Sequence, residues 1–475
     1  MLPPPPVSIT LDTVYAKEPL SGRMIDRVSW SPDGARFLYV RRSQDPNENL
    51  ALLLYDMATG TTRVWLRSET FAATPEVAGW SPDAKHVALL AGGDLYTADT
   101  VRPHPRKIAA DVDAAQWSPQ ADVLAYSHDA DLYLAAVGKH VAIRQITRGG
   151  VPNDLLNGSL DWVYPEELGI EHGFRWSPDG KRIAYLTMNE RRVTNFPIVD
   201  FLTTDNKVER ERYPLAGEAN PRVTLRVVTL STGANHLVYD AARRDEYLAN
   251  FDWLPHSDSL EAEILDRAQR AMRVELWRHA AGSPSELYRQ TSPSWVDVVP
   301  LPFWRSSGRS VWLLDRAHTA GVYVRERDGS FRKLSGAYRV TDLFGVADGT
   351  VYISAAYPTR RDRSFLALSL SGAQRNFTAE PGWHESVPAP TFTGFVDTYS
   401  RLNDPPQVNL VALPSGAAKN LAPENLSLKA ALSPAKMLDI PSAYGALDAF
   451  EIDPPGFERS KKWPVVMYVY GGPDA

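Results

Sequence analysis

The stretch Trp30–Gly34, "WSPDG", recurs at Trp176–Gly180, and this repetition decides the fold. Variants of the same five residues occur at intervals in the first two thirds of the chain: "WSPDA", "WSPQA" and the weaker copies "WLPHS" and "WRSSG". The copies lie about 40–75 residues apart, which is the spacing of propeller blades with insertions. The six copies begin at Trp30, Trp80, Trp117, Trp176, Trp253 and Trp304.

Each copy has the chemistry of a tight turn between two strands. Proline fixes φ at the first central position of a turn, and Asp and Gly suit the later positions. An apolar run rich in Val, Ile, Tyr, Leu or Trp follows, which is typical of a strand. The runs are "RFLYV" (36–40), "HVALL" (86–90), "VLAYS" (123–127), "RIAYL" (182–186) and "SVWLL" (310–314).

These patterns predict an all-β protein, a β-propeller in which blades stack radially because no blade can bury its faces alone. Two further blades are expected in residues 335–440, where "LFGVADGTVYISAAY" and "NLVALPSGAAKNL" are strand-like but lack the tryptophan. The prediction is seven or eight blades, with eight favoured. The repeated tryptophans are interpreted as packing residues without direct chemistry.

Composition narrows the classes of function. The 475-residue chain has a formal net charge of -6 and no basic tract, so a nucleic-acid partner is not expected. It contains no Cys, which excludes disulfides, a thiol nucleophile and Cys-ligated metals. No apolar run approaches the roughly 20 residues of a membrane span. The start, "MLPPPPVSIT", has no signal-peptide pattern.

The pattern changes after about residue 440. The last residues read as a strand at Ala449–Ile452, a Pro/Gly turn, a charged loop and a continuous apolar run, "PVVMYVY" (464–470). Such a run is typical of a buried strand in an α/β sheet. The predicted domains are therefore an N-terminal segment (1–21), a propeller (22–440) and the first strands of an incomplete α/β-hydrolase domain (441–475).

Motifs for nucleophilic or metal chemistry are absent from the sequence. No serine lies in G-x-S-x-G, the elbow that an α/β-hydrolase nucleophile requires. No H-E-x-x-H or close histidine pair occurs, so neither a metal site nor a cofactor is predicted. His172 is interpreted as a polar loop histidine.

Several stretches together resemble the dipeptidyl peptidase IV branch of the prolyl oligopeptidase family. They are "DWVYPEELGIEHGFRWSPDGKRIAYLTMNE" (161–190), "YPLAGEANPRVTLRVV" (213–228), "YLANFDWLP" (247–255), "ILDRAQ" (264–269) and "PPGFERSKKWPVVMYVYGGP" (454–473). The resemblance covers nearly the whole chain and implies an eight-bladed propeller joined to an α/β-hydrolase domain. It implies a serine exopeptidase that releases N-terminal Xaa-Pro or Xaa-Ala dipeptides.

The adjacent carboxylates Glu166 and Glu167 fall on the two positions at which this family holds the substrate's free α-ammonium. Charge-assisted hydrogen bonds of that kind contribute roughly 1.5–3 kcal/mol each. A blocked peptide N-terminus would lose the ion pair and leave buried acids unpaired. By pattern alone, two such glutamates are more often solvated surface residues. Pro165 stands where the mammalian enzyme has a third acid, and the sequence does not identify the arginine that assists the substrate.

Tyr470, in "YGGP", falls on the family's oxyanion-hole tyrosine, although a buried tyrosine at a strand end would give the same pattern. The triad Ser, Asp and His that the resemblance implies would all follow Ala475, so these 475 residues alone are expected to be inactive. The implied partners are a peptide with a free N-terminus and, for the complete protein, a second copy in a homodimer. Relatives in this family are often periplasmic or secreted, and a cytoplasmic location stays open.

Two other functions fit parts of the pattern. A tripeptidyl or acylaminoacyl peptidase would share the fold, but the adjacent glutamate pair favours dipeptides. A non-catalytic propeller acting as a peptide-binding or scaffold module fits the repeats equally well, but does not explain the hydrolase-like segment after residue 440.

Overall fold

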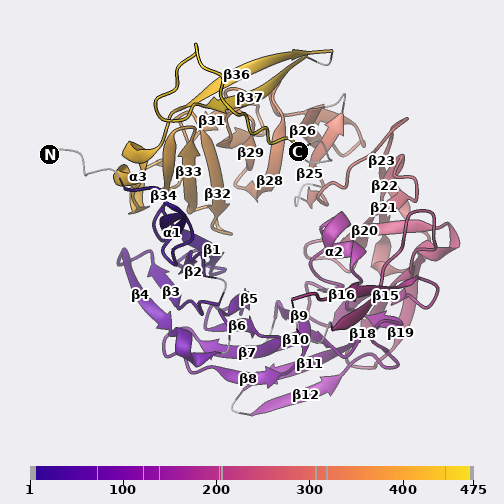
Figure 1. The fold of residues 1–475 in the computed structure, drawn as a ribbon. Helices are drawn as coiled ribbons and strands as arrows, with labels where there is room; N and C mark the ends of the chain where they lie inside the picture. The colour runs from indigo at the N-terminus through magenta and orange to yellow at the C-terminus, as the bar shows by residue number, and fades with distance from the viewer. Residues whose placement is uncertain are drawn as a thin grey trace.

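The computed structural model describes residues 7–470, except residues 46, 72, 121, 139, 203, 205–206, 305–307, 317–318 and 444. Eight antiparallel sheets of four or five strands form a closed ring among these residues, so the predicted eight-bladed propeller is confirmed (Figure 1). Each blade uses strands that follow one another in the chain, and the sheet order matches the chain order in seven of the eight blades.

The first four blades are built from residues 25–240. Blade 1 contains β1 (Ile25–Trp30), β2 (Arg36–Arg41), β3 (Leu52–Asp56) and β4 (Thr61–Leu66). Blade 2 contains β5 (Glu76–Trp80), β6 (His86–Ala91), β7 (Asp94–Asp99) and β8 (Arg106–Ala109). Blade 3 contains β9 (Val112–Trp117), β10 (Val123–His128), β11 (Asp131–Val137) and β12 (Val141–Gln145). Blade 4 contains β13 (Leu155–Asn157), β14 (Phe174–Trp176), β15 (Arg182–Asn189), β18 (Arg222–Thr229) and β19 (Asn235–Asp240).

The last four blades are built from residues 246–422. Blade 5 contains β20 (Glu246–Trp253), β21 (Leu260–Asp266), β22 (Ala271–Trp277) and β23 (Ser285–Thr291). Blade 6 contains β24 (Phe303–Trp304), β25 (Ser310–Arg316), β26 (Thr319–Arg325) and β27 (Phe331–Lys333). Blade 7 contains β28 (Val340–Ala347), β29 (Thr350–Ala355), β30 (Ser364–Ser369) and β31 (Gln374–Asn376). Blade 8 contains β32 (Trp383–Pro388), β33 (Gly394–Arg401), β34 (Asp404–Ala412) and β35 (Ala418–Ala422).

Each of the six repeat tryptophans is the last residue of a strand, and its indole N–H reaches the preceding blade. That strand is the first of its blade in five cases and is β14, the second, in blade 4. Trp80 donates to Ser29 Oγ at 3.1 Å, and Trp117 donates to the Gly79 carbonyl at 3.1 Å. Trp30 in blade 1 donates to the Val387 carbonyl of blade 8 at 3.0 Å. This last bond closes the ring. The other three bonds run from Trp176 to the Gln116 carbonyl, from Trp253 to the Arg175 carbonyl and from Trp304 to Glu261 Oε2.

The turn after each tryptophan is held by its own side chains. Ser31 is fully buried, and its hydroxyl donates to Asp33 Oδ1 at 2.5 Å. The same hydroxyl accepts the backbone N–H of Arg36 at 3.0 Å, which fixes the start of β2. Ser81 and Ser177 repeat this arrangement in blades 2 and 4. A short polar side chain that satisfies nearby backbone groups is the reason why Ser and Asp favour turns.

The fifth residue of the motif adopts a left-handed conformation. Gly34 and Gly180 both have φ of +67°, and Ala84 has φ of +56°. A Cβ built on Gly34 would lie 2.3 Å from Thr391 Oγ1 in blade 8. The left-handed conformation favours glycine at this position, and the close approach of the Thr391 side chain adds a steric reason at Gly34 that goes beyond the backbone conformation.

Blades 7 and 8 lack the tryptophan and use aromatic stacking instead. Phe365 of β30 stacks on Phe395 of β33 with ring centroids 4.2 Å apart. Tyr352 of β29 stacks on Phe392 at the same centroid separation, 4.2 Å. Aromatic pairs of this kind add about 0.5–1.5 kcal/mol beyond their buried area. The strand-like segments predicted within residues 335–440 are thus confirmed as blades.

The remaining elements are not part of the eight blade sheets. Helix α2 (Val163–Leu168) and the hairpin of β16 (Asn195–Val199) and β17 (Val208–Arg212) are insertions in blade 4, while α1 (Leu11–Val14) and α3 (Leu426–Ala431) flank the ring. Three single-turn 3-10 helices are also present, at Ser68–Thr70, Ala241–Arg243 and Arg278–Ala280. None of the helices among the described residues is long and apolar enough to cross a membrane.

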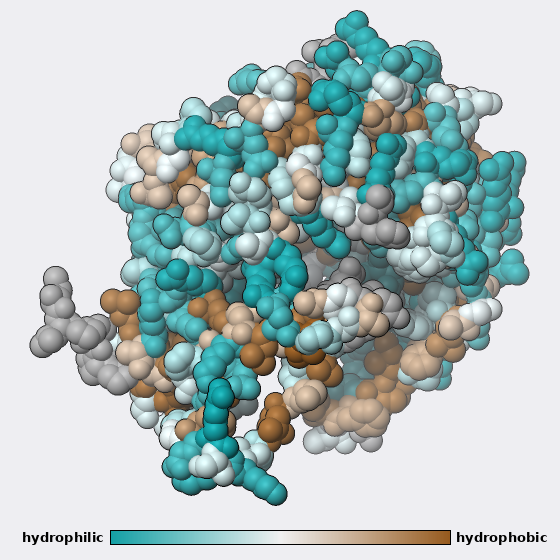
Figure 2. Space-filling model, turned by 90° about the horizontal axis from the view of Figure 1, so that it is seen from above, coloured by the Kyte–Doolittle hydropathy of each residue, from teal (hydrophilic) through white to brown (hydrophobic). Residues whose placement is uncertain are grey.

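The segment after the propeller differs in part from its prediction. Strands β36 (Ala435–Ser442) and β37 (Gly445–Ile452) form a hairpin, which includes the strand expected at Ala449–Ile452 and spans the predicted boundary at residue 441. Residues 464–470 form no strand, and Val466 is 96% exposed, so the prediction of a buried strand is wrong for this chain. The physical reason is that no described segment pairs with it. Figure 2 shows hydrophobic residues at the surface among a mainly hydrophilic face.

Replacing Trp30 by Phe tests the bond that closes the ring. The change removes the indole N–H and leaves the Val387 carbonyl without its partner, which costs about 1–3 kcal/mol. We therefore expect a lower midpoint in urea denaturation. Trp295→Phe is the matched control, because Trp295 is 54% exposed and its indole bonds only to Asp297 two residues away. Equal midpoints for the two variants would contradict the role of Trp30.

Two glutamates of β21 are buried in blade 5. Glu263 is fully buried; its Oε1 accepts the Val299 N–H at 3.1 Å, and its Oε2 has no hydrogen-bond partner. Burial raises the pKa of Glu263 to about 8, and burial also raises the pKa of Glu261 to about 8. Both carboxyls are therefore protonated in the folded protein at neutral pH, and each loses a proton when the chain unfolds.

This proton loss predicts that stability falls as pH rises. The unfolded chain ionises near the ordinary glutamate pKa of 4.5 and the folded chain near 8, so the loss occurs between these values. Each buried group should lower the free energy of unfolding by about 1.4 kcal/mol per pH unit in that window. Glu263→Gln should remove the contribution of one group to this pH dependence. Near pH 8 the variant should therefore unfold at a higher urea concentration than the unmodified protein. The exposed Glu385, changed to Gln, is the control, and a Glu263 variant with an unaltered pH profile would refute the assignment.

Candidate functional site

Helix α2, which carries the two predicted ligand glutamates, is fixed at both ends. Asp161 Oδ1 accepts the backbone N–H of Tyr164 at 3.0 Å, as a helix-capping side chain does. Gly169 ends the helix in a left-handed conformation with φ of +67°, and the Ile170 N–H returns to the Tyr164 carbonyl at 3.1 Å. Pro165 lies in the first turn, where its missing N–H has no helical partner to lose.

The helix rests on the propeller through one face. Tyr164 and Leu168 are buried in a core cluster that includes residues of blades 4, 5 and 6. The Tyr164 hydroxyl accepts the backbone N–H of Leu248, on β20, at 3.4 Å. Trp162, just before the helix, packs on Tyr213 with ring centroids 4.8 Å apart. Figure 1 shows α2 on the inner side of the ring.

Glu166 and Glu167 lie on the exposed part of α2. Neither carboxylate has a hydrogen-bond or ion-pair partner among the residues that the structure describes. Both side chains face solvent in this chain. Successive helical residues point about 100° apart, so the two carboxylates leave the helix in different directions and would meet only on a ligand placed between them.

Tyr470 lies in the exposed segment 464–470 and is 68% exposed. Within the described part of the chain, no hydrogen bond joins it to the glutamate pair or to any other residue. The structure therefore does not bring Tyr470 together with Glu166 and Glu167. His172 follows α2 in a loop, as predicted, but it is half-buried and its Nδ1 has no hydrogen-bond partner. Burial lowers the pKa of His172, so the imidazole is mainly neutral at pH 7.

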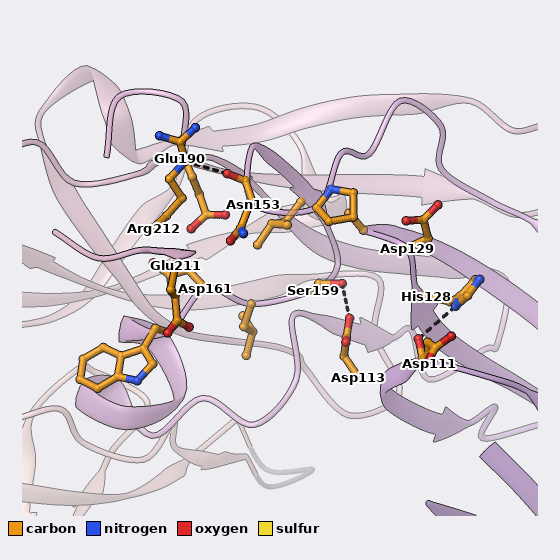
Figure 3. Close-up of a pocket in the computed structure, with 15 residues that line it drawn as sticks. Asp111, Asp113, His128, Asp129, Asn153, Ser159, Asp161, Glu190, Glu211 and Arg212 are labelled. Carbon is orange, nitrogen blue, oxygen red and sulfur yellow. Dashed lines mark hydrogen bonds between the residues drawn. The ribbon is translucent and has the colours of Figure 1, made fainter. Parts of the chain in front are cut away.

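A cavity of about 550 Å³ opens where blades 3 and 4 meet, at the N-terminal end of α2. Figure 3 shows the residues around it. It is strongly acidic: among the described residues, six carboxylates line it, against one arginine, Arg212, and one histidine, His128. The six are Asp111, Asp113, Asp129, Asp161, Glu190 and Glu211.

Three of these carboxyls ionise with difficulty. Burial raises the pKa of Asp113. Burial raises the pKa of Asp161 to about 6. Burial, followed by the negative charge of Asp161, raises the pKa of Glu190 to about 7. Groups with such perturbed pKa values in a cavity are typical of binding or catalytic sites. Elsewhere in the lining, Ser159 donates to Asp113 Oδ2 at 2.8 Å, which holds the walls of blades 3 and 4 together.

These cavity residues were not predicted as site residues from the sequence. Asp161 and Glu190 begin and end the stretch 161–190 that carries the family resemblance, yet Asp161 reads there only as a turn residue before an aromatic run. Glu190 lies beyond the end of β15, and nothing in its neighbours indicates burial. Among the described residues, no group of three or more His, Asp or Glu side chains could hold a metal ion.

The fold defines the chain as an eight-bladed β-propeller with an inserted helix that presents two free carboxylates. The family described as the dipeptidyl peptidase IV (DPP IV) N-terminal region matches residues 92–406, more than half of the chain. The chain therefore belongs to this family, and the resemblance read from its sequence is confirmed as a dipeptidyl peptidase IV-like propeller region.

Relatives of known name are similar over part of their length. Venom dipeptidyl peptidase 4 of Apis mellifera is 24% identical over 369 residues, which cover 70% of this chain and 47% of that protein. Inactive dipeptidyl peptidase 10 of Mus musculus is 33% identical over 159 residues, or 32% of this chain and 20% of that protein. The chain spans less than half the length of the curated relatives it matches.

Solved structures share the fold. Porphyromonas gingivalis dipeptidyl peptidase 4 superposes with a TM-score of 0.79 at 21% identity, covering 97% of this chain and 69% of that one. A structure described as a putative dipeptidyl aminopeptidase IV from Bacteroides ovatus gives a TM-score of 0.77 at 19% identity, covering 99% and 70%. At these identities the likeness establishes the architecture alone.

Proposed function

We propose that this chain is the substrate-selecting propeller of a serine exopeptidase that releases N-terminal Xaa-Pro or Xaa-Ala dipeptides from peptides. The observation that carries the proposal is the pair Glu166 and Glu167, two exposed carboxylates without a partner among the described residues, on a helix at the inner side of the ring. Membership in the dipeptidyl peptidase IV N-terminal family and relatives named dipeptidyl peptidase support the reaction class.

The geometry suggests how the pair would select a substrate. An α-ammonium has three N–H donors, and two carboxylates can accept two of them with charge-assisted bonds. Because α2 is capped by Asp161 and anchored through Tyr164, the pair occupies a fixed place relative to the blades. A peptide held there by its N-terminus would present a bond at a set distance along its chain, which explains release of a fragment of constant length.

In the complete protein the propeller would limit access to the catalytic centre, and the chemistry would be acyl transfer by a Ser nucleophile, a His base and an orienting Asp. Tyr470 would donate its phenol O–H to the developing oxyanion, where one donor contributes roughly 2.7–4 kcal/mol. No cofactor enters this scheme.

A second candidate is a non-catalytic peptide-binding propeller. The observation that favours it is the mouse relative, 33% identical over its matched segment and named an inactive dipeptidyl peptidase. Both candidates use the glutamate pair to capture a peptide, and they differ only in turnover. A full-length protein that binds a free-N-terminus peptide but does not cleave it would select the second candidate.

Replacing Glu166 or Glu167 by Gln in the full-length protein tests the anchor. Each change removes a charge while keeping the side-chain size, so KM for a Gly-Pro-anilide substrate should rise by about 10-fold or more. Glu171→Gln, an exposed glutamate just beyond the helix, is the matched control. Acetylating the substrate N-terminus should raise KM for the unmodified enzyme and erase the difference between variants. Unchanged kinetics in both Gln variants would eliminate the anchor.

Tyr470→Phe tests the second predicted residue separately. Loss of one oxyanion donor should lower kcat by about 100-fold while KM changes little. The comparison requires the same substrate and single-turnover rates, so that product release does not hide the chemical step. A variant with full turnover would show that Tyr470 is only a structural tyrosine.

A further inference from the structure

The acidic cavity between blades 3 and 4 has no role in the proposed capture of a peptide N-terminus. Glu166 and Glu167 do not line it. Its carboxylates come from the start of β9, the β10–β11 turn, the segment before α2, the residue after β15 and the end of β17, so the chain brings them together from five places. Acidic surfaces are common, and the argument therefore rests on how individual carboxyls are bonded.

Asp161 is 7% exposed and only half satisfied. Its Oδ1 caps α2, whereas its Oδ2 is buried and has no hydrogen-bond partner among the described residues. A capping role alone would be filled equally well by Asn or Ser, which prefer the same position and carry no charge. A buried carboxylate oxygen left without a donor is rare in folded proteins and calls for a ligand or another compensating group.

Glu190 is a second buried acid that lines the same cavity. It is 3% exposed, and no hydrogen bond or ion pair to its carboxylate occurs among the described residues. Its backbone accounts for its structural role: the Glu190 N–H donates to the Asp154 carbonyl at 2.9 Å, and its carbonyl accepts from Val193 at 2.8 Å. The charged side chain contributes nothing to that turn.

The one arginine in the lining is already engaged. Arg212 Nη2 bonds to Asp154 Oδ1 at 2.7 Å, outside the cavity lining. Its Nε and Nη1 bond to the carbonyls of Asn153 and Val193 at 2.8 and 2.9 Å. Arg212 therefore moderates the negative potential at a distance and gives no direct donor to Asp161 or Glu190.

The walls between the acids are apolar. Leu156, Leu160, Pro152 and the Trp162 side chain line the cavity along with the carboxylates. Its volume of about 550 Å³ lies within the range of small-ligand sites. A ligand that suits this surface has a positive end with several N–H donors and a short aliphatic stem.

We propose that this cavity binds a primary alkylammonium group, with Asp161 and Glu190 as the principal acceptors and the apolar walls enclosing the alkyl chain. The group can belong to a lysine side chain of a bound peptide or to a free aliphatic diamine; both carry the same chemistry. An ammonium supplies three donors, which is enough for Asp161 Oδ2 and the Glu190 carboxylate together.

Binding should strengthen as pH rises. The ammonium must replace the protons that Asp161 and Glu190 hold at low pH, since their pKa values are raised to about 6 and about 7. The charged groups that face these two are Asp154, Glu211 and Arg212, with Asp111, Asp113, Asp129 and His128 across the cavity. Negative charges outnumber positive charges among these groups. This excess favours binding of a cation throughout the pH range considered.

The test is calorimetric titration of the 475-residue chain with three probes. They are 1,4-diaminobutane, N-acetyl-lysine N-methylamide and the neutral isostere N-acetyl-norleucine N-methylamide. The blocked ends of the lysine probe keep it from using the glutamate pair as a peptide N-terminus would. We expect millimolar or tighter binding of at least one amine, none of the norleucine probe, and tighter binding at about pH 8 than at about pH 5.

Two isosteric variants and two controls locate the site. Asp161→Asn keeps an oxygen for the helix cap and Glu190→Gln keeps the side-chain volume; each should weaken the amine by about 10-fold or more. Glu171→Gln and the double change Glu166→Gln/Glu167→Gln carry charge changes outside the cavity and should leave the affinity within about 2-fold. Thermal midpoints show whether each variant is folded. If one of the two cavity variants does not fold, the other one still tests the site.

The outcomes separate clearly. Binding of the lysine probe identifies a peptide side chain as the source, and binding of the diamine alone identifies a free amine. No amine binding at millimolar concentration, equal binding of the norleucine probe, or affinity unaltered in both cavity variants would overturn the proposal. Loss of amine binding in the Glu166/Glu167 double variant would assign the cation to that pair instead. Failure of the peptidase proposal leaves these results untouched, because none of the probes is cleaved.

Discussion

The hydrogen bond from each repeat tryptophan to the preceding blade is the interaction on which the ring depends. A four-stranded sheet has two faces to bury and can do so only against its neighbours, so each blade contact must be specified in the sequence. The tryptophan does this by packing its ring between blades and directing its N–H at a fixed acceptor. Because Trp30 reaches Val387, 357 residues away, the same device that spaces the first blades also closes the circle. The repeat tryptophan is missing from blades 7 and 8. There, stacked aromatic rings such as Phe365 and Phe395 connect the two blades in place of the indole hydrogen bond.

Local sequence was informative about this fold because the repeat combines three independent signals. Ser31, Pro32 and Asp33 specify the turn, Trp30 marks the end of the first strand, and an apolar run gives the second. Residues 464–470 show the limit of the same reasoning. The run "PVVMYVY" has the composition of a buried strand, but a strand needs a partner with free backbone groups, and composition cannot supply one. In the described chain no partner is present, and Val466 is exposed instead.

The candidate site was predictable only where it carries a motif. Glu166 and Glu167 stand out because they are adjacent and follow "DWVYP", and the resemblance assigns them a role. The acidic cavity has no such signature. Its members are separated by up to 101 positions, from Asp111 to Arg212, and they meet because blade 4 carries the β16–β17 insertion beside blade 3. Asp161 and Glu190 are buried because these separate segments pack together. No single stretch of the sequence indicates that packing.

Helix α2 links the two acidic features of this propeller. Its N-terminal end is capped by Asp161, whose second oxygen belongs to the cavity, and the same short helix carries Glu166 and Glu167. The helix is only six residues long and gains little from its own hydrogen bonds, so its cap and its buried Tyr164 determine whether it forms. A cation placed against Asp161 Oδ2 would keep that carboxyl ionised, and an ionised carboxylate is the better acceptor for the Tyr164 N–H and the better partner for the helix dipole. Occupation of the cavity would thus favour the same helical conformation that presents the glutamate pair, and the two sites would support each other through one short element.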